Sequence, residues 1–226
     1  MESARAMSGL ETTIETGDLL RDGPPAADWT LVLAHGAGAP MDSDFMREIA
    51  KRLAARGVAV VRFEFDYMKA RRQDGKRRPP QREPALLARW HAVIDALRAE
   101  SPAPRRLAIG GKSMGGRMAS LIADEVGADA LVCLGYPFHP PGKPERTRTR
   151  HLQDIRTPTL ICQGERDPFG GRDEVSGYAL SPAIRLEWAP DGDHDLKPRK
   201  KSGHSHEAVL DRVAAAVRAH FDDCAR

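Results

Sequence analysis

Short apolar runs alternate along this chain with longer segments of helical periodicity, and this alternation restricts the fold more than any other feature of the sequence. The apolar runs, which we expect to be buried strands, are 29–35, 58–65, 106–110, 130–136, 159–164 and 184–189. The periodic segments, which we expect to be amphipathic helices, are 43–56, 84–97, 114–126 and 206–221. Strands that alternate with helices and are apolar on both faces indicate a parallel sheet covered on each side. The predicted class is therefore α/β, with a doubly wound, mostly parallel sheet and helices on both faces.

The domain organisation follows from length and from the even spread of composition. The chain has 226 residues, and no change of composition marks a boundary within it. We therefore expect a single domain over residues 11–226, preceded by a disordered N-terminus at residues 1–10. Within that domain, the early segment from Glu11 to Arg21 is expected to add an antiparallel edge strand to the sheet.

Hydropathy and cysteine usage bear on the compartment. No apolar run approaches the roughly 20 residues that a membrane-spanning helix needs, and Met1 to Leu10 lack the apolar core of a secretory signal. The three cysteines, Cys133, Cys162 and Cys224, are an odd number, which favours free thiols over a disulfide framework. We expect a cytoplasmic protein that does not engage a membrane.

A serine lies between two glycines at the junction of a predicted strand and a predicted helix. The motif Gly111-Lys112-Ser113-Met114-Gly115 has the G-x-S-x-G pattern in the context that a nucleophile elbow requires. A sharp strand-to-helix turn lifts the serine hydroxyl above the sheet, and the flanking glycines let neighbouring backbone pass without Cβ clashes. Ser113 is therefore the candidate nucleophile, and a glycine-rich turn with an incidental serine is the alternative.

A serine hydroxyl needs a base, and that base needs an acid to orient it. In the doubly wound hydrolase plan these partners follow the serine in the order acid, then histidine. Asp167 comes just after the apolar run 159–164, and His194 lies in the loop after the run 184–189. Both therefore belong at the rim of the sheet where ligand sites form. Other acidic residues near Asp167 in the sequence are Asp154, Glu165 and Asp173.

Acyl chemistry further requires backbone N–H groups that stabilise a developing oxyanion. The plan takes one donor from the residue after the nucleophile, here Met114, and another from a glycine-rich loop after an earlier strand. The loop His35-Gly36-Ala37-Gly38 offers Ala37 or Gly36 for the second donor. We expect no metal and no cofactor, because the sequence lacks an H-E-x-x-H motif, a paired C-x-x-C, and a G-x-G-x-x-G after a strand.

These motifs together resemble the α/β-hydrolase superfamily from about Trp29 onward. The segments LVLAHGAGAPMDSDFM (31–46), GGKSMGGRMAS (110–120) and GERDPFG (164–170) are similar to its dienelactone-hydrolase-like branch, which includes the testis-expressed-thirty protein and the third subunit of the NSL chromatin complex. The resemblance implies a triad of Ser113, Asp167 and His194 that hydrolyses an ester, thioester or amide. The chain departs from dienelactone hydrolase itself by carrying serine where that enzyme has cysteine, which argues against a lactone substrate.

Two further features concern the substrate. The stretch from Pro137 to Thr157 is too short for a large lid over the site. The net positive charge is confined to the segments 69–82, 143–150 and 197–201, which we interpret as loops that follow the carboxyl ends of strands. They predict a positively charged mouth that attracts small anionic acyl substrates, with Lys112 and His35 as substrate contacts. The alternative is that the basic segments are solubilising surface.

Three function classes remain. The leading one is a serine hydrolase that acts through an acyl-enzyme intermediate. The others are a catalytically silent binding or scaffold module on the same fold, and a serine peptidase. Nucleic-acid binding is disfavoured because no aromatic residues interleave with the basic ones. The expected partner is a small acyl substrate; the sequence indicates no oligomeric state.

Overall fold

Seven strands form one mixed sheet in the computed structural model, which describes residues 18–226. The order across the sheet is β1-β3-β2-β4-β5-β6-β7, and every pair is parallel except β1 with β3. The strands are β1 (Leu19–Asp22), β2 (Trp29–Ala34), β3 (Ala59–Phe63), β4 (Arg106–Lys112), β5 (Ala130–Leu134), β6 (Thr159–Gly164) and β7 (Ile184–Ala189). The last residues of the segment expected to form an antiparallel edge strand, 19–21, lie in β1, which pairs antiparallel with β3. Residues 11–17 of that segment, and residues 1–10 with their expected disorder, lie outside the described residues.

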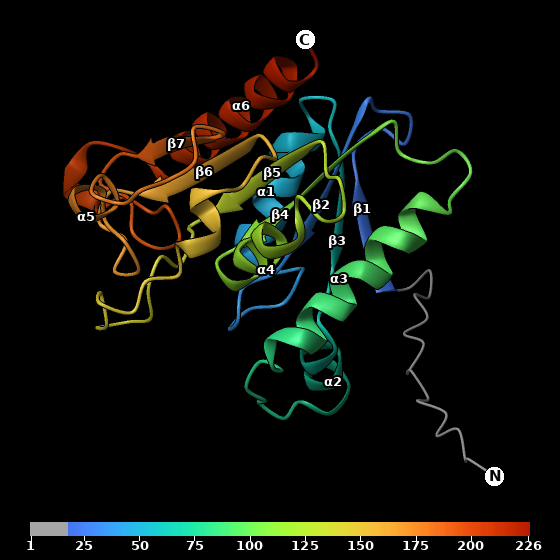
Figure 1. Ribbon diagram of the computed structural model, residues 1–226, viewed down its shortest axis with the longest axis horizontal. Coiled ribbons are helices and arrows are strands. Elements are labelled where there is room, and N and C mark those ends of the chain that lie inside the picture. The colour runs from blue at the N-terminus through green and yellow to red at the C-terminus, as the bar shows by residue number, and fades with distance from the viewer. Residues whose placement is uncertain (1–17) are drawn as a thin grey trace.

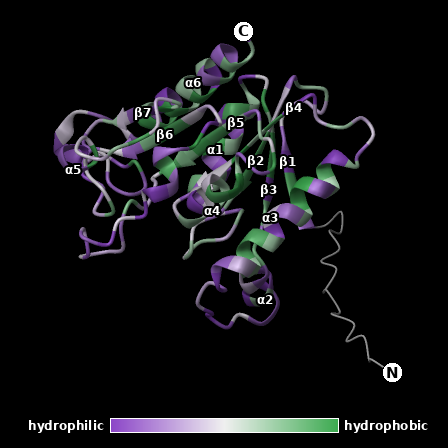
Figure 2. Cartoon of the chain, in the orientation of Figure 1, coloured by the Kyte–Doolittle hydropathy of each residue, from purple (hydrophilic) through white to green (hydrophobic). Residues whose placement is uncertain are grey.

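Helices cover both faces of this sheet, as the alternating pattern predicts (Figure 1). The longer helices are α1 (Asp44–Ala54), α2 (Asp66–Asp74), α3 (Glu83–Arg98), α4 (Met114–Ile122) and α6 (His206–Cys224). One core cluster packs α3 and α4 against the sheet, and a second cluster packs α1 and α6 against the opposite face. Figure 2 shows hydrophobic residues concentrated on the central strands between these layers. No helix of the described residues has the length and apolar character needed to cross a membrane.

The helix α2 corrects the sequence analysis, which interprets residues 69–82 as loop. Residues 69–74 are helical, although this segment has no apolar face that would signal a helix. Ion pairs supply the missing stabilisation, because Arg72 contacts both Asp42 (2.9 Å) and Glu64 (2.6 Å). Gly75 then ends the helix in the left-handed conformation, at φ +71°. Charge pairing between distant segments thus forms a helix that periodicity does not reveal.

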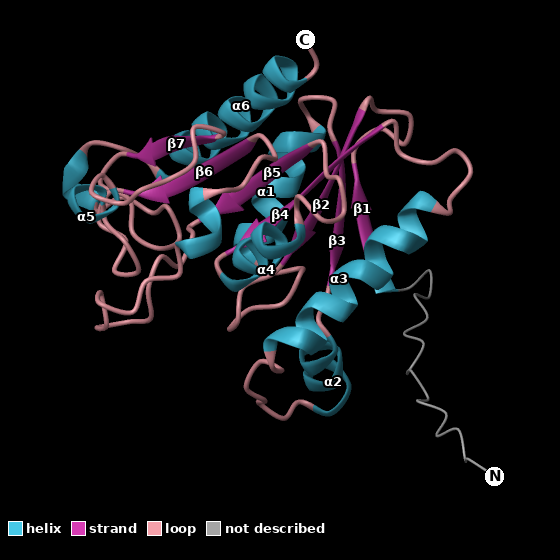
Figure 3. Ribbon diagram, in the orientation of Figure 1, coloured by secondary structure: helices cyan, strands magenta, loops and turns pink. Residues whose placement is uncertain are grey.

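The connection between β5 and β6 contains no lid. Its only helical piece is the short 3-10 turn Arg150–Gln153, and the remainder is loop (Figure 3). The short helix α5 (Arg172–Val175) follows β6, and a second 3-10 turn (Lys200–Ser202) precedes α6. The carboxyl ends of β4, β5, β6 and β7 are therefore left uncovered by any large inserted helix.

Candidate active site

Ser113 occupies the sharp turn between β4 and α4, in the strained backbone conformation expected of a nucleophile elbow. Its φ of +52° and ψ of −116° lie outside the regions that a non-glycine residue ordinarily adopts. The surrounding backbone explains the flanking glycines. A Cβ on Gly111 would come within 2.3 Å of the Ala34 carbonyl oxygen, and one on Gly115 within 2.4 Å of the same atom. Only glycine at both positions lets α4 begin this close to β2.

His194 and Asp167 complete a hydrogen-bonded chain with that serine. His194 Nε2 lies 2.9 Å from Ser113 Oγ, and His194 Nδ1 lies 2.8 Å from Asp167 Oδ2. Both distances are within the reach that general-base chemistry requires. The three residues follow β4, β6 and β7, in the order that the sequence analysis expects, and they meet at the carboxyl ends of these strands. Of the acidic residues near position 167, only Asp167 touches the imidazole within the described part of the chain.

Asp167 is fixed by donors that the sequence analysis does not identify. Its side chain is buried, and Oδ1 accepts a hydrogen bond from the Phe169 N–H at 2.8 Å. Oδ2 accepts one from Gln163 Nε2 at 3.0 Å. Gln163 is itself fully buried at the end of β6 and exchanges hydrogen bonds with the backbone of Tyr136. A glutamine inside the otherwise apolar run 159–164 is the sequence signal that could have identified it.

Lys112 is hydrogen-bonded to the loop that carries His194, here called the histidine loop, and does not extend into the cavity or the solvent. Its Nζ donates to the His194 carbonyl oxygen at 2.8 Å and lies 3.2 Å from an Asp195 carboxylate oxygen. Burial lowers the pKa of Lys112, while the Asp195 charge opposes that shift. These contacts support a positioning role for Lys112 over the expected substrate contact. It joins the elbow to the loop that carries the imidazole, so it is a positioning residue.

His35 is likewise structural. Its ring is fully buried, Nδ1 donates to the Gly36 carbonyl oxygen at 2.7 Å, and Nε2 accepts from the Phe65 N–H at 3.2 Å. Burial lowers its pKa, so the neutral ring keeps both bonds at physiological pH. Because both ring nitrogens are bonded within the protein, these contacts favour a structural role for His35 over the expected substrate contact. It ties the glycine-rich loop to the segment after β3, and Tyr67 Oη adds a bond to the Ala37 carbonyl oxygen at 3.0 Å.

A cavity of about 380 Å³ opens beside the serine, within the size range of small-molecule sites. Ser113, Met114 and Ala37 all line it. Met114 is the first residue of α4, where a backbone N–H has no acceptor within the helix. Gly36 does not line this cavity; a Cβ placed on it would point toward Lys112 and the Ser113 Cβ, at 3.6 Å. Of the two residues proposed for the loop donor, Ala37 therefore borders the space where an acyl group would lie.

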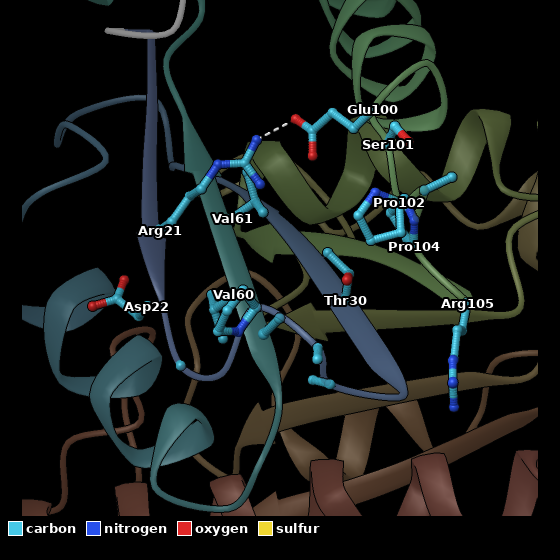
Figure 4. A pocket seen from close by; sticks show the side chains of 16 residues that line it. Arg21, Asp22, Thr30, Val60, Val61, Glu100, Ser101, Pro102, Pro104 and Arg105 are labelled. Atoms are coloured by element: carbon cyan, nitrogen blue, oxygen red, sulfur yellow. Dashed lines mark hydrogen bonds and ion pairs between the residues drawn. The ribbon is translucent and has the colours of Figure 1, made fainter.

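A larger cavity, of about 630 Å³, lies at the opposite end of the sheet (Figure 4). Thr30 at the start of β2 and Val60 near the start of β3 border it, together with the segment before β4. Its polar wall includes the Arg21–Glu100 ion pair drawn in Figure 4. Because it lies far from the carboxyl ends of the strands, it has no access to Ser113.

Part of the charge of the basic segments is paired with carboxylates, whereas the segment 143–150 makes no ion pair among the described residues. In the segment 69–82, Lys69 pairs with Asp18, and Arg78 pairs with Asp74. In the segment 197–201, Arg199 pairs with Asp191. These pairs join residues that are far apart in sequence or separated by a turn, so composition alone overestimates the free charge.

Comparison with known proteins identifies the family of this chain. Residues 27–222 match the family described as the alpha/beta hydrolase domain, and the chain therefore belongs to that family. None of the curated proteins matches the sequence.

Solved structures share the fold. A dienelactone hydrolase from Anabaena variabilis is 23% identical, with a TM-score of 0.70 over 91% of this chain and 90% of that one. XC6422 from Xanthomonas campestris, described as an a/b serine hydrolase without a lid, is 20% identical, with a TM-score of 0.67 over 91% and 88%. Est1E from Butyrivibrio proteoclasticus is 18% identical, with a TM-score of 0.63 over 91% and 93%. The chain is a lidless α/β hydrolase in architecture, and hydrolase activity is the general function that this family supports.

Proposed function

We propose that this protein is a serine hydrolase that cleaves an ester, thioester or amide of a small acyl substrate through an acyl-enzyme intermediate. The observation that carries the proposal is the continuous hydrogen-bonded chain from Ser113 Oγ through the His194 ring to Asp167. A buried carboxylate beside an imidazole that reaches a serine on a strained turn has no evident structural purpose. The hydrogen-bonded arrangement of Ser113, His194 and Asp167 supports catalysis over the alternative of a silent scaffold.

The reaction follows from these positions. His194 Nε2 takes the Oγ proton as Ser113 attacks the substrate carbonyl carbon, and Asp167 stabilises the imidazolium that forms. The carbonyl oxygen becomes an oxyanion, and the proposed donors to it are the N–H groups of Met114 and Ala37, which both line the cavity. His194 then gives its proton to the leaving group as the tetrahedral intermediate collapses. A water molecule, deprotonated by the same imidazole, attacks the acyl carbon. His194 then returns that proton to Ser113 Oγ as the acyl–oxygen bond breaks and the acid product leaves.

The cellular location and the type of bond that is cleaved are argued from the cysteines and from the lining of the cavity. Among the described residues, Cys133, Cys162 and Cys224 are free thiols, which supports the cytoplasmic location that we propose. A serine peptidase uses the same three side chains and is the alternative activity. An apolar wall of Leu86 and Met118 beside the serine favours a compact acyl group over an extended peptide.

A fluorophosphonate probe tests the proposal directly, because it reacts with a serine that a general base activates. We expect stoichiometric labelling of Ser113 in the folded protein and hydrolysis of short-chain 4-nitrophenyl esters. The Ser113→Ala variant should lose both. Ser120→Ala is the matched control, since Ser120 Oγ bonds to the Arg117 carbonyl and the His151 ring instead. A folded wild-type protein that neither labels nor turns over ester would favour the scaffold.

A further inference from the structure

The cavity beside Ser113 contains one positive charge without a partner. Its charged lining residues are Glu83, Arg117 and Arg148. Arg117 and Glu83 form an ion pair at 2.9 Å and so neutralise each other. Within the described part of the chain, no carboxylate lies within ion-pair distance of Arg148, and its guanidinium makes no hydrogen bond. The cavity therefore carries a net charge of about +1 on a side chain that is free to bind.

Arg148 is held by a rigid frame, although it belongs to a long connection between β5 and β6. Its backbone N–H donates to the Phe138 carbonyl oxygen at 2.7 Å, and its carbonyl oxygen accepts from Tyr136 Oη at 2.9 Å. Both aromatic residues are fully buried and pack edge to face, with ring centroids 4.9 Å apart. The next residue, Thr149, is also buried. This frame fixes where the Arg148 side chain begins, at the wall of the cavity.

The environment of Arg148 is unfavourable for an isolated cation. Burial and the like charge of Arg117 both lower its pKa from the ordinary value. An anion bound in the cavity would relieve both effects. A guanidinium presents paired N–H donors whose geometry matches a carboxylate, so it binds that group with two parallel hydrogen bonds. Other arginines of the basic segments, such as Arg72 and Arg199, already make such contacts within the protein.

We propose that Arg148 is an anion subsite, and that the substrate of the proposed hydrolase is an ester, thioester or amide carrying one carboxylate. This inference rests on the proposed function and names its substrate class. The single unpaired charge matches a monoanion better than a dianionic phosphate. Met114, Met118 and Phe169 line the same cavity as Arg148 and Ser113, and these apolar side chains suit a short hydrocarbon spacer between the carboxylate and the reacting carbonyl.

A matched pair of esters tests the subsite. The mono-4-nitrophenyl ester of glutaric acid carries a carboxylate on its acyl chain, and 4-nitrophenyl valerate is a neutral analogue of similar length. For Arg148→Gln we expect kcat/KM to fall about 10- to 100-fold for the glutarate ester and to change less than threefold for the valerate ester, as for loss of a charged hydrogen bond. Arg150→Gln removes an equal charge two residues away, on an exposed side chain outside the cavity, and should leave both esters within twofold.

A binding measurement separates the subsite from the chemistry. Calorimetric titration of the Ser113→Ala variant with monomethyl glutarate should give a Kd at least tenfold lower than that of the Ser113→Ala, Arg148→Gln double variant. Equal binding by both variants, or an equal loss of both ester activities in Arg148→Gln, would overturn the subsite. If the wild type turned over no ester while the two Kd values still differed tenfold, the proposed function would fail and the subsite would stand.

Discussion

Gly135 is the residue whose replacement most directly tests how the histidine loop is positioned. It follows β5 with a φ of +65°, and a Cβ there would lie 2.6 Å from the His194 carbonyl oxygen. That Cβ would also lie 3.2 Å from Lys112 Nζ and 3.4 Å from His194 Nδ1. The carbonyl is the atom to which Lys112 donates its 2.8 Å bond. The substitution Gly135→Ala therefore pushes on the backbone of the proposed general base without altering any reacting group.

The size of the effect follows from these contacts. Ordinary van der Waals contact begins at 3.4 Å, so the carbonyl oxygen or the new methyl group must move by about 0.8 Å. A displacement of about 1 Å in a reacting group can cost about 100-fold in rate. We expect kcat/KM of Gly135→Ala to fall 10- to 100-fold. Left-handed backbone with a Cβ adds a stability loss of about 1–2 kcal/mol.

Gly127→Ala separates the two contributions. Gly127 has a similar φ of +58°, but a Cβ there would meet nothing within 4 Å. It should lose about 1 kcal/mol of stability from backbone strain alone and keep ester hydrolysis within twofold of wild type. Rates of 4-nitrophenyl acetate hydrolysis and of fluorophosphonate labelling are measured well below both unfolding midpoints. Wild-type rates in folded Gly135→Ala would refute the argument that the His194 carbonyl sets the position of the ring.

The remaining predictions concern neighbouring groups and pH. Lys112→Met should lower kcat/KM about tenfold for anionic and neutral esters alike, because Lys112 holds the loop; a loss confined to anionic esters would restore it as a substrate contact. Asp167→Asn should lower kcat about 10⁴-fold, as for loss of the correct imidazole tautomer, with melting curves confirming the fold. Burial lowers the pKa of His151 from 6.5 to about 4, so only the unfolded chain binds a proton there between those values. Stability should therefore fall from about pH 6.5 to 4, and urea unfolding should show a smaller fall in His151→Gln than in the exposed-site control His204→Gln.

The fold is predictable from the sequence wherever burial leaves a periodic signature. The strands β2, β6 and β7 lie within the expected segments because their apolar runs are continuous and end at turns. The helix α4 ends at Ile122, earlier than the expected Val126, because the hydrophobic pattern of a helix does not define its last residue well. The helix α2 is missed altogether, since its stabilising ion pairs join residues distant in sequence.

Some features of the candidate site are likewise predictable from the sequence, and others are not. The order of Ser113, Asp167 and His194 is readable because each follows a strand, and parallel strands bring their carboxyl ends to one rim. What Lys112 and His35 touch is not readable, because a position beside a motif says nothing about the direction of a side chain. Both side chains make contacts within the protein. Ion pairs likewise neutralise some of the basic residues that composition alone presents as free charge, such as Arg72 and Arg199.

The elements that would perform the chemistry are distinct from those that would select the substrate. The reacting groups follow β4, β6 and β7, and their positions depend on glycines and buried polar contacts that tolerate little change. Arg148 comes from the β5–β6 connection, which contributes no reacting group and carries no lid. Because the site lacks a lid, few other elements can discriminate between substrates. Substitution of Arg148 should therefore change specificity while leaving the rate of serine labelling by a neutral probe unaltered. Gly135→Ala, which displaces the histidine loop, should instead slow the hydrolysis of charged and neutral esters alike.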